Sequence, residues 1–256
     1  MAQYKIISFN IRGAFGADGE NEFALRKEAV VKYLISLAPD VIGFQELNHK
    51  MRMELIALMP QYGFLGSGRE KNRLGEASVI AYRQDRLMPE RLFSEMLSPT
   101  PHIPGTTYGE DQSNCPRIFS SCDFMPIDSD TPIRVMNIHT DHMGTTARLL
   151  ECRQLLENYV QQQKLRPIPT VITGDFNALP SSPEIKLISG SEYFRDVTDN
   201  IGGSFHSFGK QLDNPDKIDY VFVSSEFTPI SVKSYRYTHD GRFLSDHDMI
   251  ESIIEI

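Results

Sequence analysis

The stretch Thr170 to Pro180, TVITGDFNALP, decides how this chain of 256 residues is interpreted. Its β-branched run ends at Gly174, a pattern typical of a buried strand that enters a turn. Asp175 and Asn177 follow two positions apart, and on extended backbone such side chains point the same way. A carboxylate and a carboxamide that converge there can orient a water molecule and bind an oxyanion. In a turn, the same two residues can instead hydrogen-bond the local backbone.

Polar side chains also stand at the edges of several other predicted strands. These strands and their polar residues are Tyr4–Asn10 with Asn10, Val41–Glu46 with Glu46, Gly75–Arg83 with Glu76, Ile133–His139 with His139, Lys217–Val223 with Asp219, and Met249–Ile254 with Asp246 and His247 just before it. Each residue alone is better explained as a cap, a packing residue or a solvated charge. Their recurrence at one strand edge after another favours a shared functional site.

Helical patterns lie between these strands. Glu22–Ala38 has an apolar stripe and is followed by Pro39, and Thr145–Gln162 has a second stripe. Ser182 and Pro183 form the N-cap and first-turn signal of a further helix, and Arg117–Phe124 is a further predicted strand. The hydrophobic content of 40% is enough for a substantial core, so we expect one α/β domain over residues 1–256.

The charge balance limits the possible partners. A net charge of −8 argues against a broad clamp on duplex DNA, but it is compatible with a small phosphate substrate or a single strand. Excess carboxylates also suit a divalent cation, because Mg²⁺ prefers hard oxygen ligands.

Other features point to no special compartment or assembly. Cys115, Cys122 and Cys152 have neither a disulfide pattern nor zinc spacing. No stretch resembles a membrane span or a signal peptide, which predicts a cytoplasmic protein, or a secreted or periplasmic one if a leader has been removed. Nothing demands a partner chain, so a monomer is expected.

In their order, the motifs ISFNIR, FQEL, GEASVIAYR, NIHTDH, ITGDFNALP, KIDYVFVS and SDHDMI resemble the endonuclease/exonuclease/phosphatase superfamily over nearly the whole chain. The segment LSPTPHIPGTTYGEDQSNCPRIFS resembles a compact bacterial branch, with Tyr108 near the place of that branch's tryptophan. The resemblance implies a four-layer α/β sandwich, in which two mixed, mainly antiparallel β-sheets pack face to face with helices outside.

The resemblance also implies roles for individual residues. Glu46 matches the principal metal ligand, supported by Asn10 and Asp246, for Mg²⁺ or Mn²⁺. His247 matches the histidine on the scissile phosphate, and Asp219 the carboxylate that orients it. The remaining matches are Asp175 and Asn177 for water positioning and phosphate binding, His139 as a second phosphate-facing histidine, and Glu76 as the partner of His139.

Four further residues are weaker candidates for the site. Arg117 lies where the family often has an arginine near the phosphate, although a surface charge is equally typical there. Asp141 and His142 fit either support of His139 or a turn. His206, in the glycine-rich GGSFHSFG, is interpreted as part of a substrate-contacting loop.

The predicted reaction is one-step, in-line hydrolysis of a phosphoester by an activated water, with phosphodiesters preferred. Phosphomonoesters of sugars or inositol remain open, as does a non-catalytic binding scaffold of the same fold. The acidic balance counts against a duplex nuclease, and the absence of tryptophan against a membrane-bound sphingomyelinase. A serine hydrolase would need a G-x-S-x-G elbow, which is missing. A zinc hydrolase would need closely spaced histidine or cysteine ligands on a helix, which His139 and His142 alone do not supply.

Overall fold

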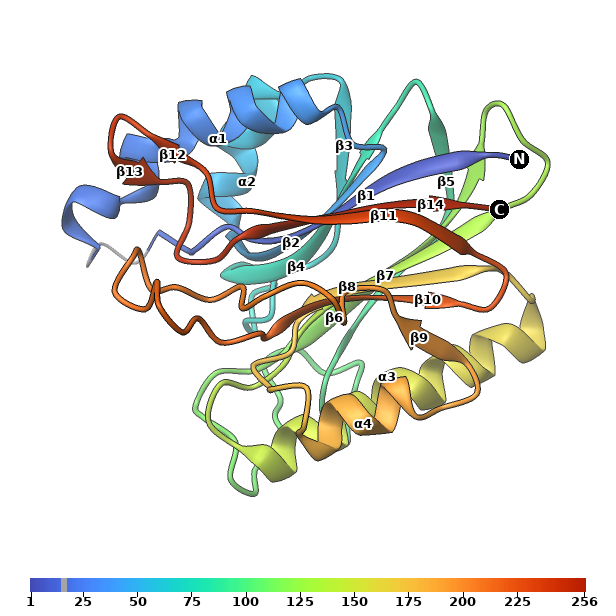
Figure 1. Ribbon diagram of the computed structural model, residues 1–256. Coiled ribbons are helices and arrows are strands. Elements are labelled where there is room, and N and C mark those ends of the chain that lie inside the picture. Colours follow the sequence, from blue (N-terminus) through green and yellow to red (C-terminus); the bar gives the residue numbers. More distant parts are fainter. Residues whose placement is uncertain (15–17) are drawn as a thin grey trace.

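The computed structural model describes residues 1–14 and 18–256, which form four layers, as the family resemblance implied (Figure 1). Helices α1 (Phe23–Leu37) and α2 (His49–Leu58) cover one sheet, and helices α3 (Thr145–Leu165) and α4 (Pro183–Ser189) cover the other. A 3-10 turn, η1 (Gly19–Asn21), precedes α1. The two sheets lie face to face between the helix layers.

The first sheet has six strands in the order β11-β14-β1-β2-β4-β3. Their bounds are β1 (Gln3–Asn10), β2 (Val41–Asn48), β3 (Tyr62–Leu65), β4 (Glu76–Arg83), β11 (Thr228–Tyr235) and β14 (Met249–Glu255). Only the central pair, β1 and β2, runs parallel; every other neighbouring pair in this sheet is antiparallel.

The second sheet repeats this plan, with the order β5-β6-β7-β8-β10-β9. Its strands are β5 (Leu87–Met96), β6 (Ile118–Pro126), β7 (Ile133–His139), β8 (Thr170–Asp175), β9 (Phe194–Asp196) and β10 (Asp219–Ser224). Here the central β7 and β8 are parallel and the remaining pairs antiparallel. A short hairpin of β12 (Thr238–His239) and β13 (Arg242–Phe243) lies apart from both sheets. The expected mixed, mainly antiparallel sheets are therefore present.

Apolar side chains fill the three interfaces between the four layers. One cluster, with Phe9, Phe44 and Leu34, lies between α1, α2 and the first sheet. A second, which includes Ile6 and Val171, lies between the sheets, and a third joins the second sheet to α3 and α4. Strands β7 and β8 are covered on both faces, so every position in them is buried. Strands in this situation tend to have apolar residues on both faces.

The two sheets also meet through a polar seam near one edge. Asn137 of β7 donates to the carbonyls of Phe44, at 2.8 Å, and Val79, at 3.0 Å, in the opposite sheet. Gly43 of β2 lies so close to β8 that a Cβ atom there would be 2.0 Å from the Thr173 Oγ1 atom. The seam holds the strand ends of the two sheets at a fixed separation.

Helix ends follow local signals. Helix α1 ends where Ala38 takes a left-handed conformation before Pro39. Pro183 occupies the first turn of α4 as predicted, but Ser182 makes no side-chain capping bond. Helix α2, which the apolar pattern did not reveal, is capped by the Asn48 side chain, which accepts from the Met51 amide at 3.0 Å. None of the helices in the described ranges is long and apolar enough to cross a membrane.

Candidate active site

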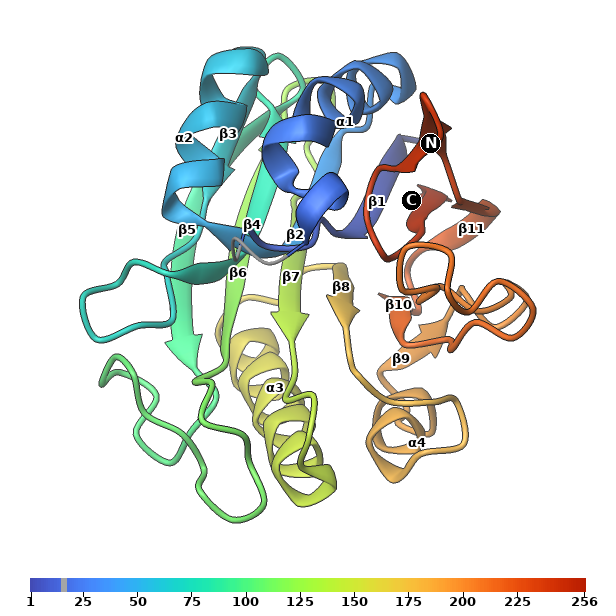
Figure 2. The ribbon, with the colours of Figure 1, turned by 90° about the vertical axis from the view of Figure 1, so that its left-hand side faces the viewer.

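The strand arrangement brings the predicted polar residues to one edge of the sandwich. Parallel strands end at the same edge, so Asn10 and Glu46 of the first sheet come together, as do His139 and Asp175 of the second. Antiparallel neighbours begin where these strands end. Glu76 therefore starts β4 at the same edge, as Asp219 starts β10 and His247 precedes β14. This edge, on the left in Figure 1, faces the viewer in Figure 2.

A cavity of about 470 Å³ opens at this edge, a size typical of small-ligand sites. Eight of the predicted residues line it: Glu46, Glu76, Arg117, His139, Asp175, Asn177, Asp246 and His247. Asn10 and Asp219 are fully buried behind its wall and contact the lining residues. His206 is the one predicted residue that does not belong to this set.

His247 is held by a buried carboxylate. Its Nδ1 atom is 2.8 Å from Oδ2 of Asp219, and that oxygen also accepts from the Ser204 hydroxyl at 2.6 Å. The other ring nitrogen, Nε2, lies 3.8 Å from Oδ2 of Asp175. Burial alone would lower the pKa of His247, but the carboxylates of Asp219 and Asp175 raise it well above its ordinary value. The ring is therefore an oriented imidazolium that presents Nε2–H to the cavity.

Asp175 occupies the centre of the site. Its Oδ2 atom accepts from Nδ2 of Asn10 at 2.8 Å, and its Oδ1 atom accepts from the backbone amide of Asn177 at 2.9 Å. Burial and the neighbouring Asp219 carboxylate raise the pKa of Asp175 to about 7. A carboxylate with this pKa is suited to exchange a proton near neutral pH.

Asn177 connects Asp175 to the second histidine. Its backbone has a φ of 47°, a left-handed conformation that asparagine tolerates better than most residues. This turn directs its Nδ2 atom to within 3.1 Å of both Nε2 of His139 and the carbonyl of Thr140. His139 Nε2 is also 3.6 Å from Oδ2 of Asp175. Both imidazole rings therefore flank the same carboxylate.

The predicted metal ligands form an oxygen-rich group beside Asp175. Glu46 has a φ of 60°, and its carboxylate accepts from the Gly13 amide at 2.8 Å and from Nδ2 of Asn10 at 3.1 Å. Asp246 is 6% exposed, and burial, together with the nearby Glu46 charge, raises its pKa. Carboxylates that repel one another in this way fit a site that receives a cation. Strained backbone at Glu46 is typical of a functional position.

A second group of donors is the cluster of Asp175, Asp219 and His247, whose ligand atoms lie within 4.8 Å of one another. These donors would also suit a metal. Asp219 Oδ2 and His247 Nδ1 are already hydrogen-bonded to each other, so a metal on either of these two atoms would replace that bond. The Glu46 group is the better match to a hard cation because its donors are oxygens.

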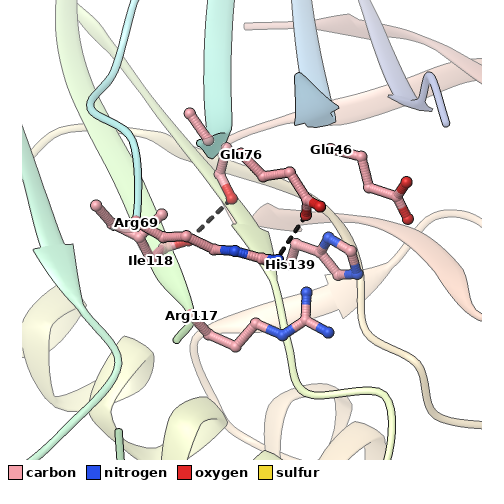
Figure 3. Close-up of a pocket in the computed structure, with 8 residues that line it drawn as sticks. Glu46, Arg69, Glu76, Arg117, Ile118 and His139 are labelled. Carbon is pink, nitrogen blue, oxygen red and sulfur yellow. Dashed lines mark hydrogen bonds and ion pairs between the residues drawn. The ribbon is translucent and has the colours of Figure 1, made fainter. Parts of the chain in front are cut away.

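The expected pairing of Glu76 with His139 is wrong. The Glu76 carboxylate instead forms an ion pair of 2.8 Å with Nη1 of Arg69 (Figure 3). The His139 ring is contacted by Asn177. The backbone explains the partner, because the Arg69 amide donates to the Glu76 carbonyl and so places the two side chains together. Burial, and after it the charges of Arg117 and Arg69, hold the pKa of His139 well below its ordinary value.

The expectation that His206 contacts substrate is also wrong. The side chain is 1% exposed, its Nδ1 atom accepts from the Gly209 amide at 3.1 Å, and its ring packs against Phe243. Its neighbours Phe205 and Ser207 line the cavity instead. Both backbone amides of His206 and Ser207 donate to the Asp246 carbonyl, which turns the loop so that His206 points away from the cavity.

Of the weaker candidates, Asp141 is structural and His142 lines the cavity. Asp141 is fully buried and accepts from the amides of Ser113, Met143 and Gly144. Nδ1 of His142 is 3.0 Å from Nη2 of Arg117. Asp141 therefore fixes the loop that holds His142 beside Arg117.

Sequence reasoning missed three residues of the site. Arg12 lines the cavity with its Nε atom 3.8 Å from Oδ2 of Asp246, and its place two positions after Asn10 was an available signal. Arg69 and Ser204 lie in loops, where neither alternation nor helical periodicity predicts the direction of a side chain.

Comparison with known proteins agrees with this geometry. The structure of an endonuclease/exonuclease/phosphatase from Bacteroides vulgatus is 26% identical, with a TM-score of 0.93 and full coverage of both chains, each 100%. A mannosyl-6-phosphatase of Bacteroides thetaiotaomicron is 24% identical, with a TM-score of 0.90 over 99% of this chain and 100% of that one.

Sequence comparison gives a further relative. An uncharacterized protein of Acanthamoeba polyphaga mimivirus is 24% identical over 183 residues, which are 68% of this chain and 66% of that protein. The model of the Endonuclease/Exonuclease/phosphatase family matches residues 7–247, a span that includes every residue of the site described above. This chain therefore belongs to the endonuclease/exonuclease/phosphatase family, whose members are hydrolases of phosphoesters.

Proposed function

We propose that this protein is a metal-dependent phosphoesterase that hydrolyses a phosphodiester by in-line attack of a water molecule. The observation that carries the proposal is the position of Asp175, whose Oδ2 atom lies 3.6 Å from Nε2 of His139 and 3.8 Å from Nε2 of His247. A phosphoryl group that enters the cavity would meet a base and two imidazoles together.

His247 is suited to stabilise charge on the phosphoryl oxygens. Because Asp219 accepts from its Nδ1 atom, the proton on Nε2 faces the cavity and can be donated to a phosphoryl oxygen. Such oriented donors act where charge develops in the transition state, commonly the largest catalytic contribution.

Asp175 is suited to position the water and accept its proton. The Asn177 amide and the Asn10 side chain fix its two oxygens, so the carboxylate cannot rotate away from the cavity. His139 is held neutral by burial and by Arg117, and its Nε2 atom accepts from Asn177, so the two side chains form a polar, uncharged part of the cavity wall.

Glu46, Asp246 and Asn10 would hold the metal, for which Mg²⁺ is our proposal and Mn²⁺ a substitute. The ion supplies Lewis-acid polarisation and charge neutralisation when bound. The donors are suitable because the buried Asp246 carboxylate has a pKa raised by burial and by the nearby charge of Glu46, which lines the same cavity.

A second candidate is a phosphomonoesterase. Arg12, Arg69 and Arg117 all line the cavity, and three guanidinium groups would suit the extra charge of a monoester. The likeness to the mannosyl-6-phosphatase, which extends over 99% of this chain, supports this candidate.

The deciding experiment compares hydrolysis of bis-p-nitrophenyl phosphate with that of p-nitrophenyl phosphate, in Mg²⁺, Mn²⁺ and EDTA. We expect the diester to be cleaved only with metal, and Glu46→Ala and His247→Ala each to reduce kcat by about 10²-fold or more. His239→Ala is the matched control, because His239 lies in the β12–β13 hairpin outside the cavity.

Preferential cleavage of the monoester would establish the second candidate instead. Full activity in EDTA, or in the Glu46→Ala variant, would contradict the metal-dependent mechanism. If neither ester is cleaved, calorimetric titration with Mg²⁺ separates a binding scaffold that has lost the metal site from an enzyme that needs a natural substrate.

A further inference from the structure

One end of the cavity carries positive charge that the reaction proposed above does not use. Arg69 and Arg117 point into this end beside Glu76 and His139 (Figure 3). Arg69 comes from the loop before β4, and Arg117 directly precedes β6, so two neighbouring loops supply the two guanidinium groups. We call this pair the arginine clamp.

Both arginines have unused hydrogen-bond donors. Nη1 of Arg69 is 2.8 Å from the Glu76 carboxylate, and Nη2 of Arg117 is 3.0 Å from Nδ1 of His142. The Nε atom of each is buried, and neither has a hydrogen-bond partner among the described residues. Arg117 is only 4% exposed, so water cannot readily replace the missing partner.

The nearby carboxylates do not fully compensate the clamp. Arg69 is paired with Glu76, and the exposed Glu70 carboxylate lies 3.9 Å from its Nε atom. The Asp141 carboxylate lies 3.8 Å from Nε of Arg117 and is already occupied by backbone amides and by Ser113. An arginine that is nearly buried and only loosely paired is well placed to receive an oxyanion, since a guanidinium can donate two parallel hydrogen bonds to it.

The clamp lines the same cavity of about 470 Å³ as Asp175 and His247. Arg69 and Arg117 also border a side recess with Ala77, Ser78 and Ile118, but its volume of about 10 Å³ holds roughly one water molecule and no phosphate group. His139 borders both spaces. An oxyanion on the clamp would therefore lie in the main cavity, beside a phosphoryl group held by Asp175 and His247.

We propose that Arg69 and Arg117 bind a second phosphate-type oxyanion of the substrate, so that the enzyme selects phosphoesters that carry another anionic group beside the scissile one. This inference rests on the proposed function for the position of the scissile group. It identifies Arg69 as a specificity-determining residue.

The test is calorimetric binding, in Mg²⁺, of alkane bisphosphonates with spacers of two, three or four carbons, compared with propylphosphonate. Their C–P bonds resist hydrolysis, so the measurement does not depend on turnover. We expect at least one bisphosphonate to bind wild-type protein about tenfold more tightly than propylphosphonate, and Arg69→Gln to remove this gain while changing propylphosphonate affinity less than about twofold.

Two further variants sharpen the test. Arg73→Gln is the matched control, because it removes the same charge from the same loop at an exposed position outside the cavity. Arg69→Lys keeps the charge and the partner of Glu76, and it should retain part of the gain, which guards against misfolding of Arg69→Gln. Equal binding of all phosphonates by the wild type, a gain that survives Arg69→Gln, or equal weakening of both ligand classes would each overturn the proposal. If the gain is present and lost as expected but no phosphoester is hydrolysed, the clamp stands and the proposed function fails.

Discussion

The two histidines of the cavity are chemically identical but lie in opposite electrostatic surroundings. His247 is enclosed by the carboxylates of Asp219 and Asp175, which raise its pKa well above the ordinary value despite burial. His139 is buried beside Arg117 and Arg69, and its pKa is held well below that value. Both rings nonetheless contact Asp175 from either side.

This difference shows that the neighbours, and not the residue type, set the role of each ring. One edge of the sandwich, where strands of both sheets end, supplies a charged donor and a neutral partner within a single cavity, with Asp175 between them. Separating protonation states by environment is how a site performs acid and base chemistry at one pH.

The largest effect on this comparison is expected from Asp219→Asn. The variant removes the charge that keeps His247 protonated and oriented, so the pKa of His247 should fall and kcat should drop about 10²-fold. NMR titration of the His247 ring gives the pKa, and hydrolysis of bis-p-nitrophenyl phosphate gives kcat. Asp216→Asn, at a partly exposed position in the segment just before β10, is the control. An unchanged His247 pKa in Asp219→Asn would show that another charge holds the proton.

A smaller effect is expected on stability from Asp175→Asn. The folded pKa of about 7 lies above the ordinary value near 3.9, so the folded state binds more protons and loses stability as pH rises from about 4 to 7. At pH 8 without metal, removing this buried charge should raise the free energy of unfolding by about 1 kcal/mol, after allowance for weakened bonds to Asn10 and Asn177. Urea denaturation in EDTA at pH 8 and pH 4.5 measures it, and the gain should shrink at the lower pH. A gain of the same size at both values would exclude titration of Asp175 as the cause.

The smallest effect is expected from Arg117→Gln on His139. Burial contributes most to the lowered pKa of this ring and would remain, so removing the guanidinium should raise the His139 pKa only slightly. NMR titration of the ring, with Arg166→Gln as a surface control, measures the change. No change in the His139 pKa would mean that burial and the remaining charges, and not Arg117, keep this ring neutral.

The strand framework and most of the site were predictable because strand edges leave a clear signal. Asn10, His139 and Asp175 each end an apolar run, and the polar residue marks the place where the strand leaves the core. Strand β5 was not predicted, because its middle positions Pro89 to Leu92 are exposed and carry no apolar alternation. Helix α2 was missed because its apolar stripe is short.

Loop residues were the part that sequence could not place. His206 and Phe205 are adjacent in a glycine-rich loop, and only the hydrogen bonds to the Asp246 carbonyl decide which of them faces the cavity. The direction of the Arg69 side chain could not be predicted for the same reason. It depends on a hydrogen bond from the Arg69 amide to the Glu76 carbonyl, which no periodicity in the sequence indicates. The Glu76 pairing was wrong for this reason.

The central position of β1 between β14 and β2 has a consequence for biosynthesis. Strand β1 and the neighbouring β14 are separated by almost the whole chain, and the amides and carbonyls of Ala2 and Ile256 pair directly. A nascent chain in which Asn10 and even Asp175 have already been synthesised still lacks His247 and the strand that pairs with one side of β1. The growing polypeptide therefore carries an unpaired edge of β1 and an incomplete site until β14 has been synthesised.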